Sequence, residues 1–212
     1  MTRPRTTARS GRAPLRRFLL LTAALGAGAC AAPLALPPAP VLERARLAPS
    51  YSALLHVSLR GPSLRARTRV VLAFRRPDAL RIEVPGPAGA RLVAVASGGR
   101  LWAVFPSERA VFSGAARAED LESLLGIALE PGEVMDLLVG TPSPRVPEYR
   151  VKWGAALPRE IRAVLPDGAR LTVKVEEAEA PAPLGAAAFA EPPHEGFRAI
   201  GAEEARSLWS VR

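Results

Sequence analysis

The feature that most constrains the fold is a series of short segments in which apolar and polar residues alternate. In the first, Leu55, Val57 and Leu59 alternate with His56 and Ser58. A period of two is the spacing of a strand with one buried face. Further segments of this kind are 64–75, 80–84, 91–96, 101–105, 110–112, 149–153, 160–165 and 170–175. Because short turns join most of them, we predict an antiparallel meander.

The alternation is interrupted near the middle of the chain by two helical patterns. In 118–125, Leu121, Leu124 and Leu125 fall on one helical face, and Gly126 ends the segment. The second pattern begins at Pro131, a residue that suits the first turn of a helix. Its apolar stripe and its glycine stop are Val134, Leu137, Leu138 and Gly140. The chain is therefore predicted to be α+β and mainly β.

Three further segments receive weaker assignments. The run 85–89, Pro-Gly-Pro-Ala-Gly, is predicted to be a loop that cannot continue a strand ladder. The Ala/Pro-rich stretch 178–193 is predicted to be an excursion anchored by Leu184 and Phe189. Residues 201–211 are predicted to form a short helix.

The N-terminal segment has the features of a secretory leader. Six arginines and no acidic residue precede Cys30, and a short apolar run from Phe18 leads to the small residues Ala27, Gly28 and Ala29. The apolar run is shorter than the roughly 20 residues that a membrane-spanning helix needs. The pattern resembles a bacterial lipobox, whose cysteine is acylated before the leader is removed. The alternative is that Cys30, the only cysteine, is an incidental thiol.

These features divide the chain into three parts. Residues 1–29 are predicted to be a signal peptide, 30–50 an acylated N-terminus with a Pro/Ala-rich tether, and 51–212 one domain. Without a second cysteine the domain has no disulfide and depends on its apolar core. Removing the six leader arginines leaves 29 − 6 = 23 basic against 20 acidic residues, so little net charge remains to favour nucleic acid.

Three stretches of the chain resemble the LolB family of outer-membrane lipoprotein receptors and the related LolA-like lipid-binding domains. They are the strand, loop and strand at 82–92, the helical region 121–140, and the terminal strands that contain 158–161 and 171–174. The resemblance implies an open, curved antiparallel half-barrel covered by short helices that form a lid over an apolar cavity. A curved open sheet also needs such a cover on physical grounds.

The resemblance and the apolar patterns together nominate the residues of the cavity and lid. They are Leu72, Phe74, Ile82, Trp102, Phe105, Leu121, Leu124, Leu125, Val134, Leu137 and Leu138. Trp102 lies in a segment that is apolar on both faces, so either side can be inward. The residues themselves leave open whether they enclose a cavity or an ordinary dry core.

One position departs from the resemblance. Members of the family that insert lipoproteins have an exposed leucine in a membrane-facing loop, and the matching loop here is Pro87, Ala88 and Gly89. Ala88 occupies the place of that leucine and offers much less apolar area to bury in lipid. Insertion of cargo by this loop is therefore in doubt.

The sequence offers no set of residues suited to catalysis. His56 and His194 are the only histidines, and no nucleophile elbow, phosphate loop or dinucleotide motif is present. We therefore expect no enzyme activity, no cofactor and no metal.

Two functions remain open after these exclusions. The first is a carrier or receptor, lipid-anchored in the bacterial outer membrane and facing the periplasm, that binds acyl chains in lipoprotein or lipid localisation. Its expected partners are acylated lipoproteins, a periplasmic LolA-like carrier or phospholipid, with no nucleic acid, and we expect a monomer. Ala31 after Cys30 favours the outer membrane, because aspartate there commonly retains lipoproteins in the inner one. The second is a structural or interaction module of an envelope complex.

Overall fold

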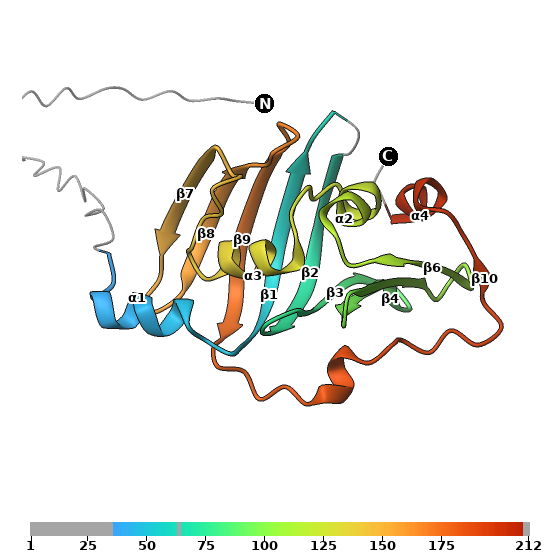
Figure 1. Cartoon of the computed structure of the whole chain (residues 1–212), viewed down its shortest axis with the longest axis horizontal. Coiled ribbons are helices and arrows are strands. Elements are labelled where there is room, and N and C mark those ends of the chain that lie inside the picture. The colour runs from blue at the N-terminus through green and yellow to red at the C-terminus, as the bar shows by residue number, and fades with distance from the viewer. Residues whose placement is uncertain (1–35, 63–64, 210–212) are drawn as a thin grey trace, which may run out of the picture. The chain divides into compact units, whose positions relative to one another are not determined.

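The computed structural model describes residues 36–62 and 65–209, so the predicted leader and Cys30 lie outside the described residues. Its dominant element is one ten-stranded sheet (Figure 1). The strands are β1 (Ser50–Arg60), β2 (Arg65–Arg75), β3 (Ala79–Gly86), β4 (Gly89–Ser97), β5 (Arg100–Phe105), β6 (Ala110–Ala115), β7 (Glu148–Trp153), β8 (Pro158–Val164), β9 (Arg170–Glu179) and β10 (Arg198–Ala199). The helices are α1 (Ala39–Arg46), α2 (Ala118–Leu125), α3 (Pro131–Leu138), α4 (Ala202–Trp209) and the short 3₁₀ helix η1 (Ala186–Phe189).

The order of strands across the sheet is β10-β6-β5-β4-β3-β2-β1-β9-β8-β7. Strands β1 to β6 form the predicted meander, and β9 returns to pair with β1, so that β8 and β7 extend the other side. All pairs are antiparallel except β10 with β6. The sheet is curved and does not close, since β10 and β7 remain its two edges (Figure 1). The predicted fold class, a mainly β open half-barrel with short helices, is confirmed.

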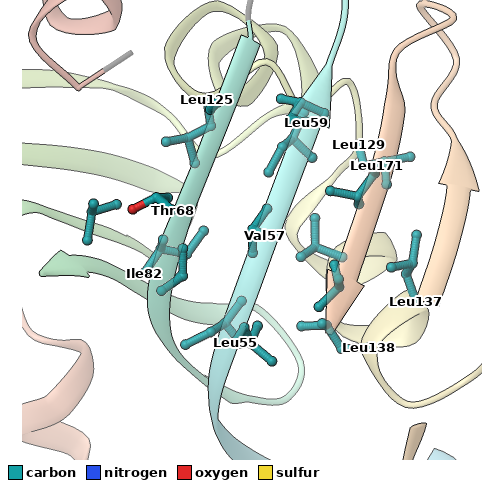
Figure 2. Close-up of a pocket in the computed structure, with 17 residues that line it drawn as sticks. Leu55, Val57, Leu59, Thr68, Ile82, Leu125, Leu129, Leu137, Leu138 and Leu171 are labelled. Atoms are coloured by element: carbon teal, nitrogen blue, oxygen red, sulfur yellow. The ribbon is translucent and has the colours of Figure 1, made fainter. Parts of the chain in front are cut away.

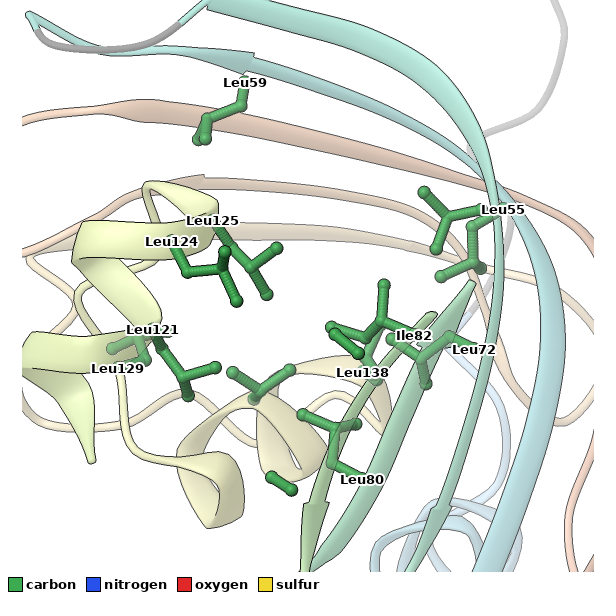
Figure 3. Close-up of a cluster of buried hydrophobic side chains, with 14 of the residues drawn as sticks. Leu55, Leu59, Leu72, Leu80, Ile82, Leu121, Leu124, Leu125, Leu129 and Leu138 are labelled. Atoms are coloured by element: carbon green, nitrogen blue, oxygen red, sulfur yellow. The ribbon is translucent and has the colours of Figure 1, made fainter. Parts of the chain in front are cut away.

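The concave face of the sheet carries the main core. Alternate residues such as Leu55, Leu72 and Ile82 point to this side and are at most 8% exposed. Helices α2 and α3 lie over the same face (Figure 1). In Figure 3 the leucines of α2, among them Leu121 and Leu124, lie across the core from the side chains of the sheet.

The convex face is covered over part of its width by the segment that follows β9. Phe189 of η1 packs on Ala73 and Ala79, with Leu184 beside it, as predicted for the two anchors of this stretch. Arg75 lies over the Phe189 ring, 5.4 Å from its centroid. This segment covers strands β2 to β4 on the convex side and then adds β10 at the edge of the sheet.

One local assignment from the sequence needs correction, and the predicted tether contains a helix. Pro85 and Gly86 belong to β3 and pair with Ala90 and Gly89, so they do continue the ladder. The register shifts at this point, and such a bulge accepts a proline because no ladder hydrogen bond is required of its nitrogen. Within the predicted tether, 39–46 forms α1, and Ala45 is buried, so this part packs on the domain.

Gly140 provides a test of the fold immediately after α3. Its φ of 87° is in the left-handed region, and a Cβ placed there would overlap the indole ring of Trp153. Gly168 has a similar φ of 82° with open space around it, so a substitution there introduces backbone strain without steric overlap.

We predict that Gly168→Ala lowers the free energy of unfolding by about 1 kcal/mol through backbone strain alone. Gly140→Ala should lower it by about 3 kcal/mol or more, because strain and steric overlap add. Urea denaturation of both variants measures the difference, and equal losses would contradict the packing of Trp153 against Gly140.

Candidate functional site

A cavity lies between the concave face of the sheet and the two lid helices α2 and α3 (Figure 2). Its lining residues are Leu55, Val57, Leu59, Ala66, Thr68, Val70, Leu72, Ile82, Val84, Leu125, Ile127, Leu129, Val134, Leu137, Leu138, Leu171 and Val173. All of them are apolar except Thr68, whose side chain ends in one hydroxyl and one methyl group. The site can therefore hold an apolar group and offers almost nothing to orient a polar one.

The cavity is small in this structure, at about 70 Å³. That volume accommodates a few water molecules, whereas pockets for small organic ligands are typically about 300–1,000 Å³. Three lining residues, Val57, Thr68 and Ile127, are only half-buried and mark where solvent approaches the cavity. An acyl chain would fit only if α2 or α3 moved away from the sheet.

The structure brings together about half of the residues nominated from the sequence. Those that line the cavity are Leu72, Ile82, Leu125, Val134, Leu137 and Leu138. Phe74, Phe105, Leu121 and Leu124 are fully buried in the surrounding core but do not line it. Trp102 alternates with Leu101 and Ala103 of the core, so it lies on the convex side, with Arg100 over its ring at 4.9 Å.

Sequence reasoning did not nominate the residues that β1 and β9 contribute. Figure 2 shows Leu55, Val57 and Leu59 along β1 and Leu171 on the neighbouring β9. Their alternation identified the apolar face of each strand. The pairing of β1 with β9, which brings Leu59 opposite Leu171, joins residues more than a hundred positions apart and has no local signal.

Helix α3 is held over the cavity by two polar contacts to other elements. The Arg76 guanidinium, in the turn between β2 and β3, lies 2.7 Å from the Asp136 carboxylate of α3. The Tyr149 hydroxyl of β7 donates to the Leu137 carbonyl oxygen at 2.8 Å. Burial raises the pKa of Tyr149, so its hydroxyl stays protonated and remains a donor throughout the physiological range.

Helix α2 is held at its C-terminal end by a different partner. Arg206 of α4 donates through Nε to the Ser123 carbonyl oxygen at 2.5 Å. A cation at this position satisfies carbonyls that a helix leaves unpaired and interacts favourably with the helix dipole. Helix α2 is thus held to the C-terminal helix, and the two lid helices are joined where the Ala118 N–H of α2 donates to the Glu130 carboxylate at the start of α3, at 3.1 Å.

The floor below α3 contains an aromatic stack. The rings of Tyr51 and Phe74 lie with centroids 5.2 Å apart, and the Arg76 guanidinium lies 5.6 Å from the Phe74 centroid. Burial raises the pKa of Tyr51, and its hydroxyl has no hydrogen-bond partner among the described residues. The Arg76 side chain thus contacts both Asp136 of α3 and the aromatic stack, and so connects the helix to the core below it.

The remaining candidates are surface residues. Pro87 and Ala88 form the exposed turn between β3 and β4, and Gly89, also exposed, begins β4. His56 pairs with Glu176 at 2.5 Å, and His194 Nδ1 lies 2.8 Å from the Pro192 carbonyl oxygen. Across residues 36–62 and 65–209, no group of three or more His, Cys, Asp or Glu side chains is placed to hold a metal ion. In the same ranges no helix is both long and apolar enough to cross a bilayer.

Comparison with known proteins gives structural neighbours only. No family model matches the sequence, and no curated protein matches it. A LolA superfamily protein from Nitrosomonas europaea aligns with a TM-score of 0.43 and 11% identity over 74% of this chain and 99% of that one. A DUF1329 family protein from Desulfovibrio piger aligns with a TM-score of 0.42 and 11% identity over 70% of this chain and 92% of that one.

A third neighbour, a domain from Vibrio parahaemolyticus named for outer membrane lipoprotein sorting, aligns with a TM-score of 0.38 and 7% identity. The alignment covers 71% of this chain and 93% of that domain. At such identities and TM-scores the likeness says nothing about a shared ligand or activity.

The anchoring of α3 gives a testable prediction. Tyr149→Phe removes one hydrogen bond to the Leu137 carbonyl and should lower the free energy of unfolding by about 1 kcal/mol. Because Tyr149 contacts α3 and Arg206 holds α2, amide hydrogen exchange should rise more in α3 than in α2. An equal rise in both helices, or no rise in either, would contradict the role of the Tyr149 contact in holding α3.

Proposed function

We propose that this protein is a lipoprotein anchored in the bacterial outer membrane through an acylated Cys30, with its domain facing the periplasm. Its half-barrel binds acyl chains and acts in the localisation of lipoproteins or lipids in the envelope. It acts without catalysis and without a cofactor. Its partners are acylated lipoproteins, a periplasmic carrier of the same fold, or phospholipid.

The observation that carries this proposal is the apolar cavity under a lid of two short helices. Sixteen of its lining residues are apolar, with Thr68 the exception, so the cavity matches a hydrocarbon chain better than any polar metabolite. Its volume of about 70 Å³ is smaller than an acyl chain needs. Binding then requires the lid to move outward, and the buried apolar area of the ligand replaces the contacts that the lid gives up.

The turn between β3 and β4 limits the role that we propose. Ala88 is exposed there and offers a single methyl group to a membrane. The proposed activity is therefore binding and localisation of acylated cargo, and we assign no insertion step to this turn.

Native mass spectrometry of the mature domain tests the proposal directly. Residues 33–212 form one compact unit, so a Cys30→Ala chain without its leader retains the whole core. Gentle purification from a bacterial envelope should yield a bound mass equal to a phospholipid or an acylated peptide. A bare protein mass that persists after incubation with lipid would favour the alternative, an interaction module that uses the half-barrel as a scaffold.

A pair of identical substitutions on the two faces of the sheet locates the binding site. Val57→Phe fills the cavity from β1 and should abolish the bound mass, since it occupies the space that the chain needs. Val71→Phe on β2 introduces the same ring on the convex face, where Val71 is 38% exposed, and should leave lipid binding unchanged. Thermal unfolding of both variants confirms that each is folded. Equal loss of lipid from both would place the ligand outside the cavity.

A further inference from the structure

The convex side of β2, β1, β9, β8 and β7 presents three rows of outward-pointing residues, because the strand register aligns them across the sheet. The row nearest the β1–β2 hairpin is Arg65, Arg60, Arg170, Val164 and Glu148. The next row is Arg67, Ser58, Thr172, Arg162 and Arg150. The third row is Arg69, His56, Lys174, Glu160 and Lys152. We refer to these three rows as the basic face.

The basic face carries more positive charge than the whole domain. Nine of its fifteen residues are arginine or lysine and two are glutamate, and Glu176 reaches it by pairing with Arg69. Its net charge is therefore 9 − 3 = +6, whereas the chain after Cys30 has 23 basic and 20 acidic residues, a net charge of +3. The remainder of the domain is then net negative, at −3. All nine cationic side chains of the face are exposed.

Most of this charge is not neutralised within the domain. Glu176 pairs with Arg69, and Glu160 pairs with Lys152 and Arg162. The cations without an ion pair among the described residues are Arg60, Arg65, Arg67, Arg150, Arg170 and Lys174.

The register adds an energetic cost to this excess of charge. Arg60 lies directly opposite Arg65 on one side and Arg170 on the other, and like charges in such positions are destabilising. A local cost that neighbouring residues do not offset is typical of a functional surface.

The composition of the basic face indicates what kind of partner it fits. None of its fifteen residues is Phe, Tyr or Trp. The energetic centres of protein interfaces are enriched in buried aromatic residues, and proteins that bind single-stranded nucleic acid stack bases on aromatic rings. An anionic bilayer surface needs neither of these, because it attracts exposed arginines and lysines through charge alone.

We propose that the basic face binds the surface of a bilayer that contains anionic lipids, without entering the hydrocarbon layer. This contact goes beyond the proposed function, since it belongs to the folded domain and is separate from the acylated Cys30. An acyl anchor would strengthen it by raising the effective concentration of the domain at the membrane. Because the cavity is on the opposite side of the sheet, the docked domain has its lid helices α2 and α3 facing away from the bilayer.

Co-sedimentation with vesicles tests the inference on the mature domain with Cys30→Ala, which has no acyl chain of its own. Vesicles of phosphatidylglycerol and phosphatidylcholine in equal amounts should bind the domain, and vesicles of phosphatidylcholine alone should not. High salt should weaken the binding, because exposed charges are readily screened.

A triple variant of the basic face locates the contact. Arg60→Gln, Arg67→Gln and Arg170→Gln together should weaken binding to the anionic vesicles about tenfold or more, because each cation near a charged membrane contributes to the attraction. None of the three residues lines the cavity. The variant also removes like-charge contacts between strands, so it should fold at least as stably as the wild type.

The matched control removes the same charge outside the basic face. Arg44→Gln, Arg46→Gln and Arg117→Gln change exposed residues of α1 and the residue before α2, and should leave vesicle binding close to that of the wild type.

Glu148→Gln gives a prediction of opposite sign. Glu148 is exposed at the β7 edge of the basic face and makes no ion pair among the described residues. Loss of its negative charge should strengthen binding to the anionic vesicles severalfold. Structural damage from a substitution does not raise affinity, so this gain would report on the charge of the face itself.

Equal binding to the two kinds of vesicle, or equal losses in the triple variant and its control, would overturn the inference. Binding of poly-glutamate or DNA through the same three arginines, without binding to anionic vesicles, would overturn it too, because the partner is then an acidic macromolecule. The proposed acyl binding is read separately. Val57→Phe, which fills the cavity, should bind anionic vesicles as the wild type does, and a failure at the basic face leaves the lipid mass in the cavity unchanged.

Discussion

The apolar concave face of the sheet is the constraint on which the rest of this structure depends. A sheet that curves without closing buries neither this face nor its edges by itself, and leaving so many leucines in water would cost far more than a domain can tolerate. Helices α2 and α3 supply the cover, and the elements around them exist largely to hold that cover in place. Arg76 and Tyr149 hold α3, while α4 carries Arg206 to the end of α2.

The same arrangement leaves one part of the core incompletely packed. Most of it is packed without space, as Leu80, Leu92 and Phe105 illustrate with at most 2% exposure. Between the lid and β1, β2 and β9, however, packing stops short and leaves an apolar cavity. An empty apolar space forfeits dispersion contacts, so a domain that retains one gives up stability at that point. A hydrocarbon chain, the ligand proposed above, would restore those contacts without requiring hydrogen bonds.

The two faces of the sheet differ in polarity. The concave face is apolar and encloses the cavity, whereas the convex face is partly covered by η1 and partly bare and basic. On the convex face Glu176 pairs with Arg69 and Glu160 with Arg162, whereas Arg60, Arg65 and Arg170 lie opposite one another without an ion pair among the described residues. The apolar and the cationic surfaces are thus separated by the sheet, on its concave and convex faces.

Much of the fold could be predicted from the sequence because its signals are local. Period-two alternation located β1 to β9 within a few residues, and the leucine spacing in 118–125 located α2. Where the local signal was ambiguous the prediction failed or stayed open. Pro85 lies within a strand because a bulge accommodates it. The alternation within 101–105 is apolar on both faces, and only the pairing of β5 with β4 places Trp102 on the convex side.

The sequence by itself determined the elements, their apolar faces and the need for a lid, since side-chain alternation and turn residues act over a few positions. Only the tertiary structure decided that β9 pairs with β1, and therefore that Leu59 and Leu171 border one cavity and Arg60 and Arg170 one charged cluster. That pairing closes a loop of more than a hundred residues. It is set by which long-range arrangement buries the most apolar surface, a property of the whole chain that no short segment encodes.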